Sequence, residues 1–274
     1  MSGQADLAPA QSASTSRSRA TRSAFARFGP PMLVVVLTIA LWELVIQILD
    51  VPSYIWSSPT QIVETIQERF PDLMGHAAVT LTETLVGFGF AVFFGLAFGL
   101  LLHFSVMARR SLYPILIASQ SIPTVVLAPV FVLVLGFGLW PKVSVVALFC
   151  FFPIVVGTID GLTSVDREYI RMMLTLDASR MGIFRRVEFP SALPQIFTGM
   201  RVGATYAAIG AVFGEWAGSQ SGLGWQMLQA KGRLDTALVF ADIVFITVMA
   251  LSLFGIVSLV ERLTIPWARK GGVT

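Results

Sequence analysis

The chain is poor in charged residues, and this scarcity sets its class. Only 13% of its 274 residues are Asp, Glu, Lys or Arg, whereas about 25% is usual in a soluble globular domain. Hydrophobic residues make up 55% of the chain, and the mean hydropathy is +0.77. The composition therefore predicts a protein of the lipid bilayer. A pI near 9.3 does not indicate nucleic-acid binding here, because the basic residues form no patch with interleaved aromatics.

Cysteine and histidine are scarce as well. The single cysteine, Cys150, lies in an apolar run, so no disulfide within the chain is possible and no neighbour in sequence would activate the thiol. His76 and His103 are far apart and have no companion cluster of Cys, Asp or Glu, which argues against a tight metal site. We interpret Cys150 as core packing and both histidines as structural or interfacial, and we assign no catalytic residue.

A nucleotide-binding loop is also missing. A loop that cradles phosphates needs Gly-Lys-Ser/Thr, but the three lysines follow Pro141, Ala230 and Arg269. ATP hydrolysis, if the protein depends on it, would take place on a partner chain.

The first thirty residues are rich in Ser, Ala and Arg, with Asp6 as their one acid. This composition predicts a disordered, basic tail over residues 1–30. An organellar transit peptide has a similar composition and is the alternative. The membrane domain would then cover residues 31–262, and residues 263–274 would form a C-terminal tail.

Long apolar runs are what the sequence has in abundance. About 20 such residues cross the roughly 30 Å of hydrocarbon in a bilayer. The runs are continuous and lack the alternation typical of a membrane barrel, so we expect an all-α membrane protein. Six segments qualify as spans: 31–49, 77–103, 112–135, 143–162, 192–213 and 237–260.

Basic residues indicate the orientation, because Lys and Arg gather on the cytoplasmic side of membrane helices. With the N-terminus inside, fifteen of the 19 Lys and Arg fall on the inner side. The outer side receives only Arg69, Lys142, Lys231 and Arg233. We therefore expect both termini to be cytoplasmic.

The outer loops have some structure of their own. After Pro59, the residues Ile62, Val63, Ile66 and Phe70 stand at helical spacing, which predicts a short helix along the outer membrane surface. The loop between the fifth and sixth spans, beginning at residue 214, is Gly-rich and then helical.

The cytoplasmic segment between the fourth and fifth spans is more distinctive. It begins with acids suited to a helix N-terminus, Asp166 and Glu168. An apolar stripe at i, i+3, i+4 and i+7 follows, and such a stripe needs a partner. It is formed by Tyr169, Met172, Met173 and Leu176. Five arginines accompany it: Arg167, Arg171, Arg180, Arg185 and Arg186. An ordinary basic loop that only fixes the topology is the alternative.

The stretch "DASRMGIFRRVEFPSALPQIFTGMR" at 177–201 resembles the EAA loop of ATP-binding-cassette importer permeases of the type I, MetI-like class. Pro190 and Pro194 would lie in the first turn of the next span. The family has Glu-Ala-Ala where this chain has Arg171-Met172-Met173, and Gly where it has Asp177. The matching positions are Ala178, Ser179, Phe184, Val187, Pro190, Leu193 and Pro194.

The resemblance extends beyond this loop. "SIPTVVLAPVFVLVLGFG" at 121–138 looks like the branch that imports alkanesulfonates, taurine, nitrate and thiamine-pathway pyrimidines. The stretch at 214–244 looks most like permeases for hydroxymethylpyrimidine-type precursors. The resemblance implies a multi-pass subunit of the bacterial inner membrane, in contact with lipid. It would work as a homodimer with two ATPase subunits that bind ATP and Mg²⁺, and with a periplasmic or lipoprotein substrate-binding protein.

The resemblance also assigns roles to residues. The cytoplasmic helix would act as a coupling helix in a groove of the ATPase. Its residues are Glu168, Tyr169, Arg171, Met172, Met173, Leu176, Asp177, Ala178 and Ser179.

Acids in or near spans are candidates for function. We interpret Glu43 and Asp160 as structural. Glu215 stands beside Trp216 and small residues that allow close helix approach, so a gate or substrate contact and a structural pairing both remain open. For Trp216 and Trp225 two interpretations are open. Either they belong to the aromatic belt at the membrane interface, or they stack on a flat heterocyclic substrate.

The cargo is inferred from the resemblance alone. A thiamine-pathway pyrimidine is preferred, with alkanesulfonate, taurine, nitrate and riboflavin-like molecules as alternatives. Other classes fit less well. A membrane enzyme would need a cluster of His, Asp or Cys, and the sequence has no such cluster. A channel or a secondary transporter is the remaining class. Internal repeats would favour a secondary transporter, and none is evident in the sequence.

Overall fold

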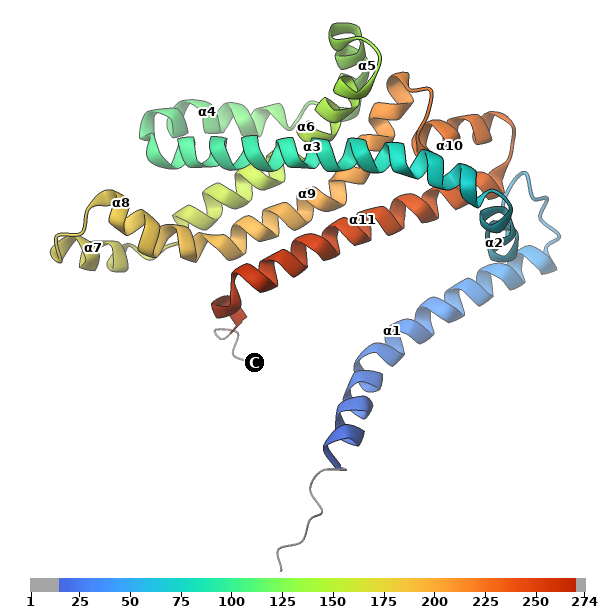
Figure 1. Ribbon diagram of the computed structural model, residues 1–274, viewed down its shortest axis with the longest axis horizontal. Helices are drawn as coiled ribbons and strands as arrows, with labels where there is room; N and C mark the ends of the chain where they lie inside the picture. The colour runs from blue at the N-terminus through green and yellow to red at the C-terminus, as the bar shows by residue number, and fades with distance from the viewer. Residues whose placement is uncertain (1–14, 270–274) are drawn as a thin grey trace, which may run out of the picture.

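Long apolar helices form the body of the protein, and the computed structural model describes residues 15–269 (Figure 1). The segments long and apolar enough to cross a membrane are Gly29–Ile48, Phe70–Phe104, Leu139–Thr163, Arg180–Gly218 and Thr236–Thr264. No strand occurs in this described part of the chain. The predicted all-α membrane fold is therefore confirmed.

Helix α6 (Leu139–Thr163) packs along both α3 (Phe70–Phe104) and α9 (Phe189–Gly218). Small residues let these helices approach closely. A Cβ at Gly199 of α9 would lie 2.5 Å from the carbonyl oxygen of Pro153 in α6, so α9 has no room for a larger residue there. Cys150 is buried in the same core, as predicted.

Helix α1 (Thr15–Ile48) leans away from this body in Figure 1. It begins at Thr15, within the segment for which the sequence predicts a disordered tail through Pro30. Ala and Arg are common there, and both favour helix. Residues 1–14 of the predicted N-terminal tail, and 270–274 of the predicted C-terminal tail, lie outside the described residues.

The third apolar segment is broken rather than continuous. Helices α4 (Val106–Ser119) and α5 (Thr124–Leu135) meet at an angle of 99°, whereas the sequence predicts one helix over 112–135. Pro123 explains the break, because a proline lacks an N–H group and disfavours helical geometry in the residue before it. Figure 1 shows α5 rising out of the body of the molecule.

One end of the long helices carries α2 (Pro59–Glu68) and α10 (Leu223–Gly232), and α11 (Thr236–Thr264) begins there. The short helix predicted after Pro59 is present, and it begins at Pro59 itself. The Ser58 side chain caps the helix and Gln61 reciprocates, which satisfies two otherwise free N–H groups. Ile62 packs with Leu73, Leu223 and Leu238, so α2 is fixed to the bundle.

The opposite end carries α7 (Arg167–Thr175) and α8 (Arg180–Ile183). A π-helical turn, Phe184–Glu188, joins α8 to α9 without interruption. Pro190 lies at the start of α9, but Pro194 is inside that helix, so its predicted place in the first turn is wrong. The short 3-10 helix Pro266–Arg269 ends the described chain.

Candidate functional site

The predicted coupling segment forms a capped helix. Asp166 accepts a hydrogen bond from the Glu168 N–H at 2.9 Å, which confirms it as the N-cap. The helix stops at Thr175, and Leu176 is the C-cap residue rather than part of α7.

The end of α7 depends on Asp177, whose φ is +56°. The N–H groups of Asp177 and Ala178 donate to the carbonyl oxygens of Leu174 and Met173, both at 3.1 Å. This pattern closes a helix around one left-handed residue, usually Gly, and Asp tolerates that conformation better than most residues. Asp177 thus occupies the position where the EAA pattern has Gly, and keeps its geometry.

The apolar residues of α7 and its C-cap residue are turned to the outside. Tyr169 is 60% exposed, Met172 54% and Leu176 70%. Glu168 and Arg171 are exposed too, while Met173 is partly buried. Among the α7 side chains that the structure describes, none is buried, so this amphipathic surface is not covered by any other part of residues 15–269.

The next turn is anchored inward. Ser179 accepts from the Gly182 N–H at 3.1 Å and caps α8. Glu188, at the end of the π-helical turn, is only 1% exposed. Its Oε1 accepts from Arg180 Nη1 at 2.9 Å, and its Oε2 lies 3.0 Å from His103 Nε2 on α3. The sequence did not single out Glu188, because its α3 partner lies 85 positions away.

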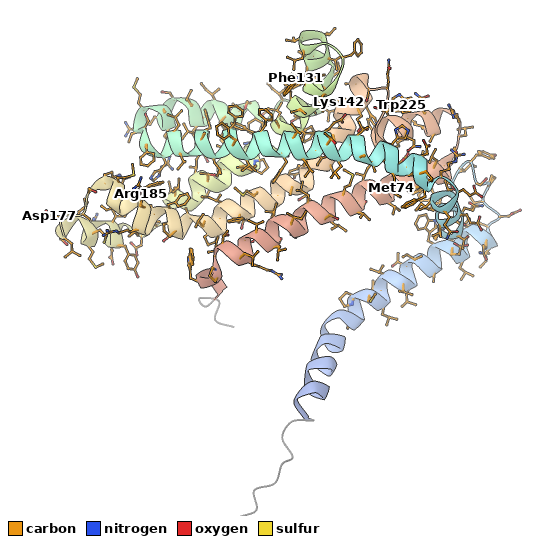
Figure 2. All side chains as sticks on the ribbon, viewed as in Figure 1. Met74, Phe131, Lys142, Asp177, Arg185 and Trp225 are labelled. Carbon is orange, nitrogen blue, oxygen red and sulfur yellow. The ribbon has the colours of Figure 1, made fainter. Side chains whose placement is uncertain are left out.

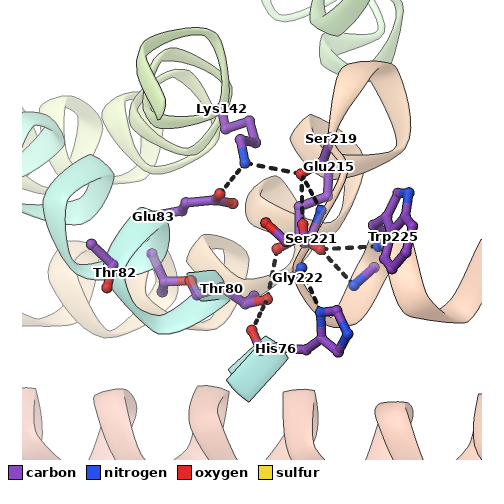
Figure 3. A network of polar contacts seen from close by, with 12 residues as sticks. His76, Thr80, Thr82, Glu83, Lys142, Glu215, Ser219, Ser221, Gly222 and Trp225 are labelled. Atoms are coloured by element: carbon purple, nitrogen blue, oxygen red, sulfur yellow. Dashed lines mark hydrogen bonds and ion pairs between the residues drawn. The ribbon is translucent and has the colours of Figure 1, made fainter. Parts of the chain in front are cut away.

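At the α2/α10 end, Glu215 organises a second group of contacts (Figure 3). Its Oε1 accepts from the Thr80 hydroxyl at 2.6 Å. Its Oε2 accepts from the N–H groups of Gly224 and Trp225, at 2.5 and 3.2 Å. The buried carboxyl group therefore holds the turn between α9 and α10 against α3.

Both tryptophans named from the sequence lie at this turn. The Trp216 Nε1–H donates to the Gly224 carbonyl oxygen at 3.0 Å. The Trp225 ring lies 5.5 Å from that of His76, whose Nδ1 accepts from the Gly222 N–H at 3.0 Å. His76 thus has the structural role expected of it. Figure 2 places Trp225 at this end and Asp177 at the other.

Lys142 is the main correction at this end. The sequence places it in an outer loop, but it lies in the first turn of α6 and is 6% exposed. It forms an ion pair with Glu83 of α3, which is 1% exposed. Its Nζ also donates to the Ser219 hydroxyl at 3.0 Å. An ion pair inside the bundle lets α6 start three residues before Lys142, because neither charge faces lipid.

The other acids differ in their surroundings. Glu43 joins α1 to α2 by accepting from the Thr60 N–H and hydroxyl at 3.1 and 2.8 Å, in keeping with a structural role. Asp160 is exposed. Asp242 is fully buried in α11, and its carboxyl oxygens have no hydrogen-bond partner among the described residues. Within 15–269, no three His, Cys, Asp or Glu side chains gather as a metal site requires.

An apolar cavity of about 410 Å³ opens between α3, α5 and α6. Aromatic side chains dominate its lining, and Ser144 supplies a hydroxyl group. Glu215, Trp216 and Trp225 are not among its lining residues. The aromatic members are Phe90, Phe94, Phe131, Trp140 and Phe151.

Residues 91–266 match the family described as "Binding-protein-dependent transport system inner membrane component". The chain is 35% identical to the formylaminopyrimidine transport permease protein ThiX of Halalkalibacterium halodurans, over 88% of this chain and 96% of that protein. It is 34% identical to the riboflavin transport system permease protein RibX of Chloroflexus aurantiacus, over 86% and 88%. It is 31% identical to the taurine transport system permease protein TauC of Escherichia coli, over 86% and 87%.

The fold is also similar to that of a solved transporter. A chain of the MetNI methionine ABC transporter, in an inward-facing conformation, superposes with a TM-score of 0.56. The match covers 69% of this chain and 95% of that chain, at 21% identity. These similarities confirm the family resemblance inferred from the stretch at 177–201.

Proposed function

The chain belongs to the family of binding-protein-dependent transport system inner membrane components, and we propose that the cargo it imports is a thiamine-pathway pyrimidine precursor. It is a multi-pass permease subunit of an ABC importer in the bacterial plasma membrane, and the ATPase is a separate chain. Similarity to ThiX over nearly its whole length supports this cargo. RibX and TauC are almost as similar, so riboflavin-like molecules, taurine, alkanesulfonates and nitrate are the alternatives.

Coupling to ATP hydrolysis is proposed for the α7 surface. The observation that carries this role is the exposure of Tyr169, Met172 and Leu176 on a helix capped at both ends. Caps at both ends stabilise the helix while another protein contacts it. Each large apolar side chain that becomes buried in the contact with the ATPase contributes about 1.5–3 kcal/mol to binding. Glu168, Arg171, Met173, Asp177, Ala178 and Ser179 would complete the contact with the ATPase.

The remaining partners follow from the same assignment. The working importer would contain two copies of this chain, two ATPase subunits that bind Mg²⁺ and ATP, and a substrate-binding protein. With both termini in the cytoplasm, the α7/α8 end faces the ATPases. The α2/α10 end then faces outward and receives the binding protein over residues 59–70 and 214–235.

A gate is proposed for the turn between α9 and α10. Glu215 holds this turn through two backbone N–H groups and through Thr80. Movement of α9 relative to α3 would break or re-form these contacts. The turn could then open and close the outer end of the route that the cargo takes through the membrane. Trp216 and Trp225 would cover the cargo at that point.

Purification of the importer from its host, by a tag at Thr274, tests these assignments. Mass spectrometry should identify an ABC ATPase and a substrate-binding protein that copurify with the chain. Calorimetry of that binding protein with formylaminopyrimidine, riboflavin and taurine should show tight binding of the pyrimidine alone. Recovery of the chain without an ATPase, where a control importer stays intact, would contradict the coupling role.

A further inference from the structure

Glu188 is a buried carboxylate with partners on two separate elements. Arg180 approaches it from α8, eight positions earlier in the chain, and His103 approaches from the last turn of α3. The Glu188 side chain is 2% exposed and that of His103 7%. Removal of a charged group from water is costly unless it is paired and hydrogen-bonded, so this contact is a built feature of the fold.

Aromatic rings lie beside this contact. The Phe184 ring lies 4.8 Å from that of Phe104 and 6.0 Å from that of His103, measured between centroids. The Phe189 ring lies 5.7 Å from that of Phe184. Exclusion of water by these rings strengthens a charged hydrogen bond. The end of α3 and the π-helical turn are thus held as one unit.

The position of Glu188 matters because of what lies on each side of it. The exposed surface of α7 and the α8 turn precede it, and the long helix α9 follows it without interruption. Movement of α7 can pass into α9 through the continuous backbone. The backbone reaches α3 only by way of α6, α5 and α4, and α3 carries Glu83 and Thr80, which lie at the proposed gate near its other end.

We propose that Glu188 is a positioning residue that transmits movement of the coupling segment to α3 through His103. Arg180 holds the carboxylate on the moving side, and His103 holds it on α3. Movement of α7 and α8 by an ATPase would therefore shift α3 and α9 together, so that both sides of the Glu215 contact respond to ATP. The inference rests on the coupling role proposed above for α7.

Hydrogen exchange measured by mass spectrometry on the whole importer tests this directly, since exchange reports local opening of backbone hydrogen bonds. The complex is compared without nucleotide and with ATP and orthovanadate. In the wild type, exchange should change both over residues 167–183 and over residues 98–105. In Glu188→Ala the first change should persist and the second should be lost.

Two further variants separate transmission from folding. His103→Leu removes the hydrogen-bonding group but leaves the Arg180–Glu188 contact in place, and it should also lose the response over 98–105. Arg186→Ala removes a charge from the same turn, and Arg186 has no ion-pair partner among the described residues. It should keep both responses.

A response over 98–105 that survives in both Glu188→Ala and His103→Leu would overturn the inference, and so would its absence from the wild type. A wild-type complex with no response over 167–183 would overturn the coupling role of α7, and this inference with it. The two failures are therefore distinguishable in one data set.

Discussion

The carboxyl group of Glu215 occupies the space in which Gly222 would carry a Cβ atom. Gly222 has φ +109° and ψ 162°, a backbone conformation that is essentially restricted to glycine. Its N–H donates to His76. Gly222 is therefore required for two reasons. The turn needs a backbone conformation that only glycine adopts readily, and the Glu215 carboxyl group leaves no room for a Cβ atom.

Gly222→Ala should destabilise the protein. The backbone conformation alone costs an alanine about 1–3 kcal/mol, and the collision with Glu215 adds to that cost. The midpoint of thermal unfolding of the purified chain in detergent should fall. Gly232→Ala is the matched control, because Gly232 lies at the end of α10 with open space around it. Equal midpoints for the two variants would contradict the described turn.

Glu215 variants should separate a structural role from a transport role. Glu215→Ala leaves the Gly224 and Trp225 N–H groups without an acceptor, at about 1–3 kcal/mol for each buried group, and should lower thermal stability strongly. Glu215→Gln keeps one oxygen for those donors and should be milder. If Glu215 also acts as a gate, the Gln variant will lose uptake while its unfolding midpoint stays near that of the wild type. Normal uptake by a stable Gln variant would reject the gate.

Lys142→Met should be among the most damaging single changes. It leaves the Glu83 carboxylate buried without its partner, and breaking a buried ion pair from one side costs about 3–5 kcal/mol. Glu83→Gln combined with Lys142→Met should recover much of that loss, because no charge then remains unpaired. Thermal unfolding of the two single variants and the double variant gives the interaction energy. Additive losses would show that the pair contributes nothing.

The sequence predicts the long helices well, because a membrane span is a continuous run of about 20 apolar residues. It also predicts α2 and the start of α7, whose caps are local. It fails where structure depends on partners far apart. The ion pair that draws Lys142 into α6 needs Glu83, 59 positions earlier. The contact between Glu188 and His103 likewise has no local signature, since it depends on how α3 packs beside the start of α9.

The break at Pro123 shows a different limit. By hydropathy, residues 112–135 form one apolar run, but the backbone forms two helices with a sharp bend between them. Pro129 lies inside α5 without ending it, so the presence of a proline alone does not decide the outcome. Pro114 likewise lies inside α4. At Pro123 the preceding residues form a turn, so the break falls at one of the three prolines in this run.

Variants of the α7 surface test the coupling role with little effect on the fold. Met172 is 54% exposed, so Met172→Gln should leave thermal unfolding of the isolated chain unchanged. If Met172 is buried against the ATPase, the loss of about 1.5–3 kcal/mol weakens that contact about tenfold or more. Uptake by the reconstituted importer should then fall relative to its ATP hydrolysis.

The matched control for this surface is Met107→Gln, because Met107 is 81% exposed in α4 and lies outside α7. It should leave uptake and ATP hydrolysis unchanged. Arg171→Glu should resemble Met172→Gln, because it reverses a charge within the same contact. If both α7 variants transport as well as the Met107 control, α7 does not carry the movement. The exposed stripe would then only be part of a basic loop that fixes the topology.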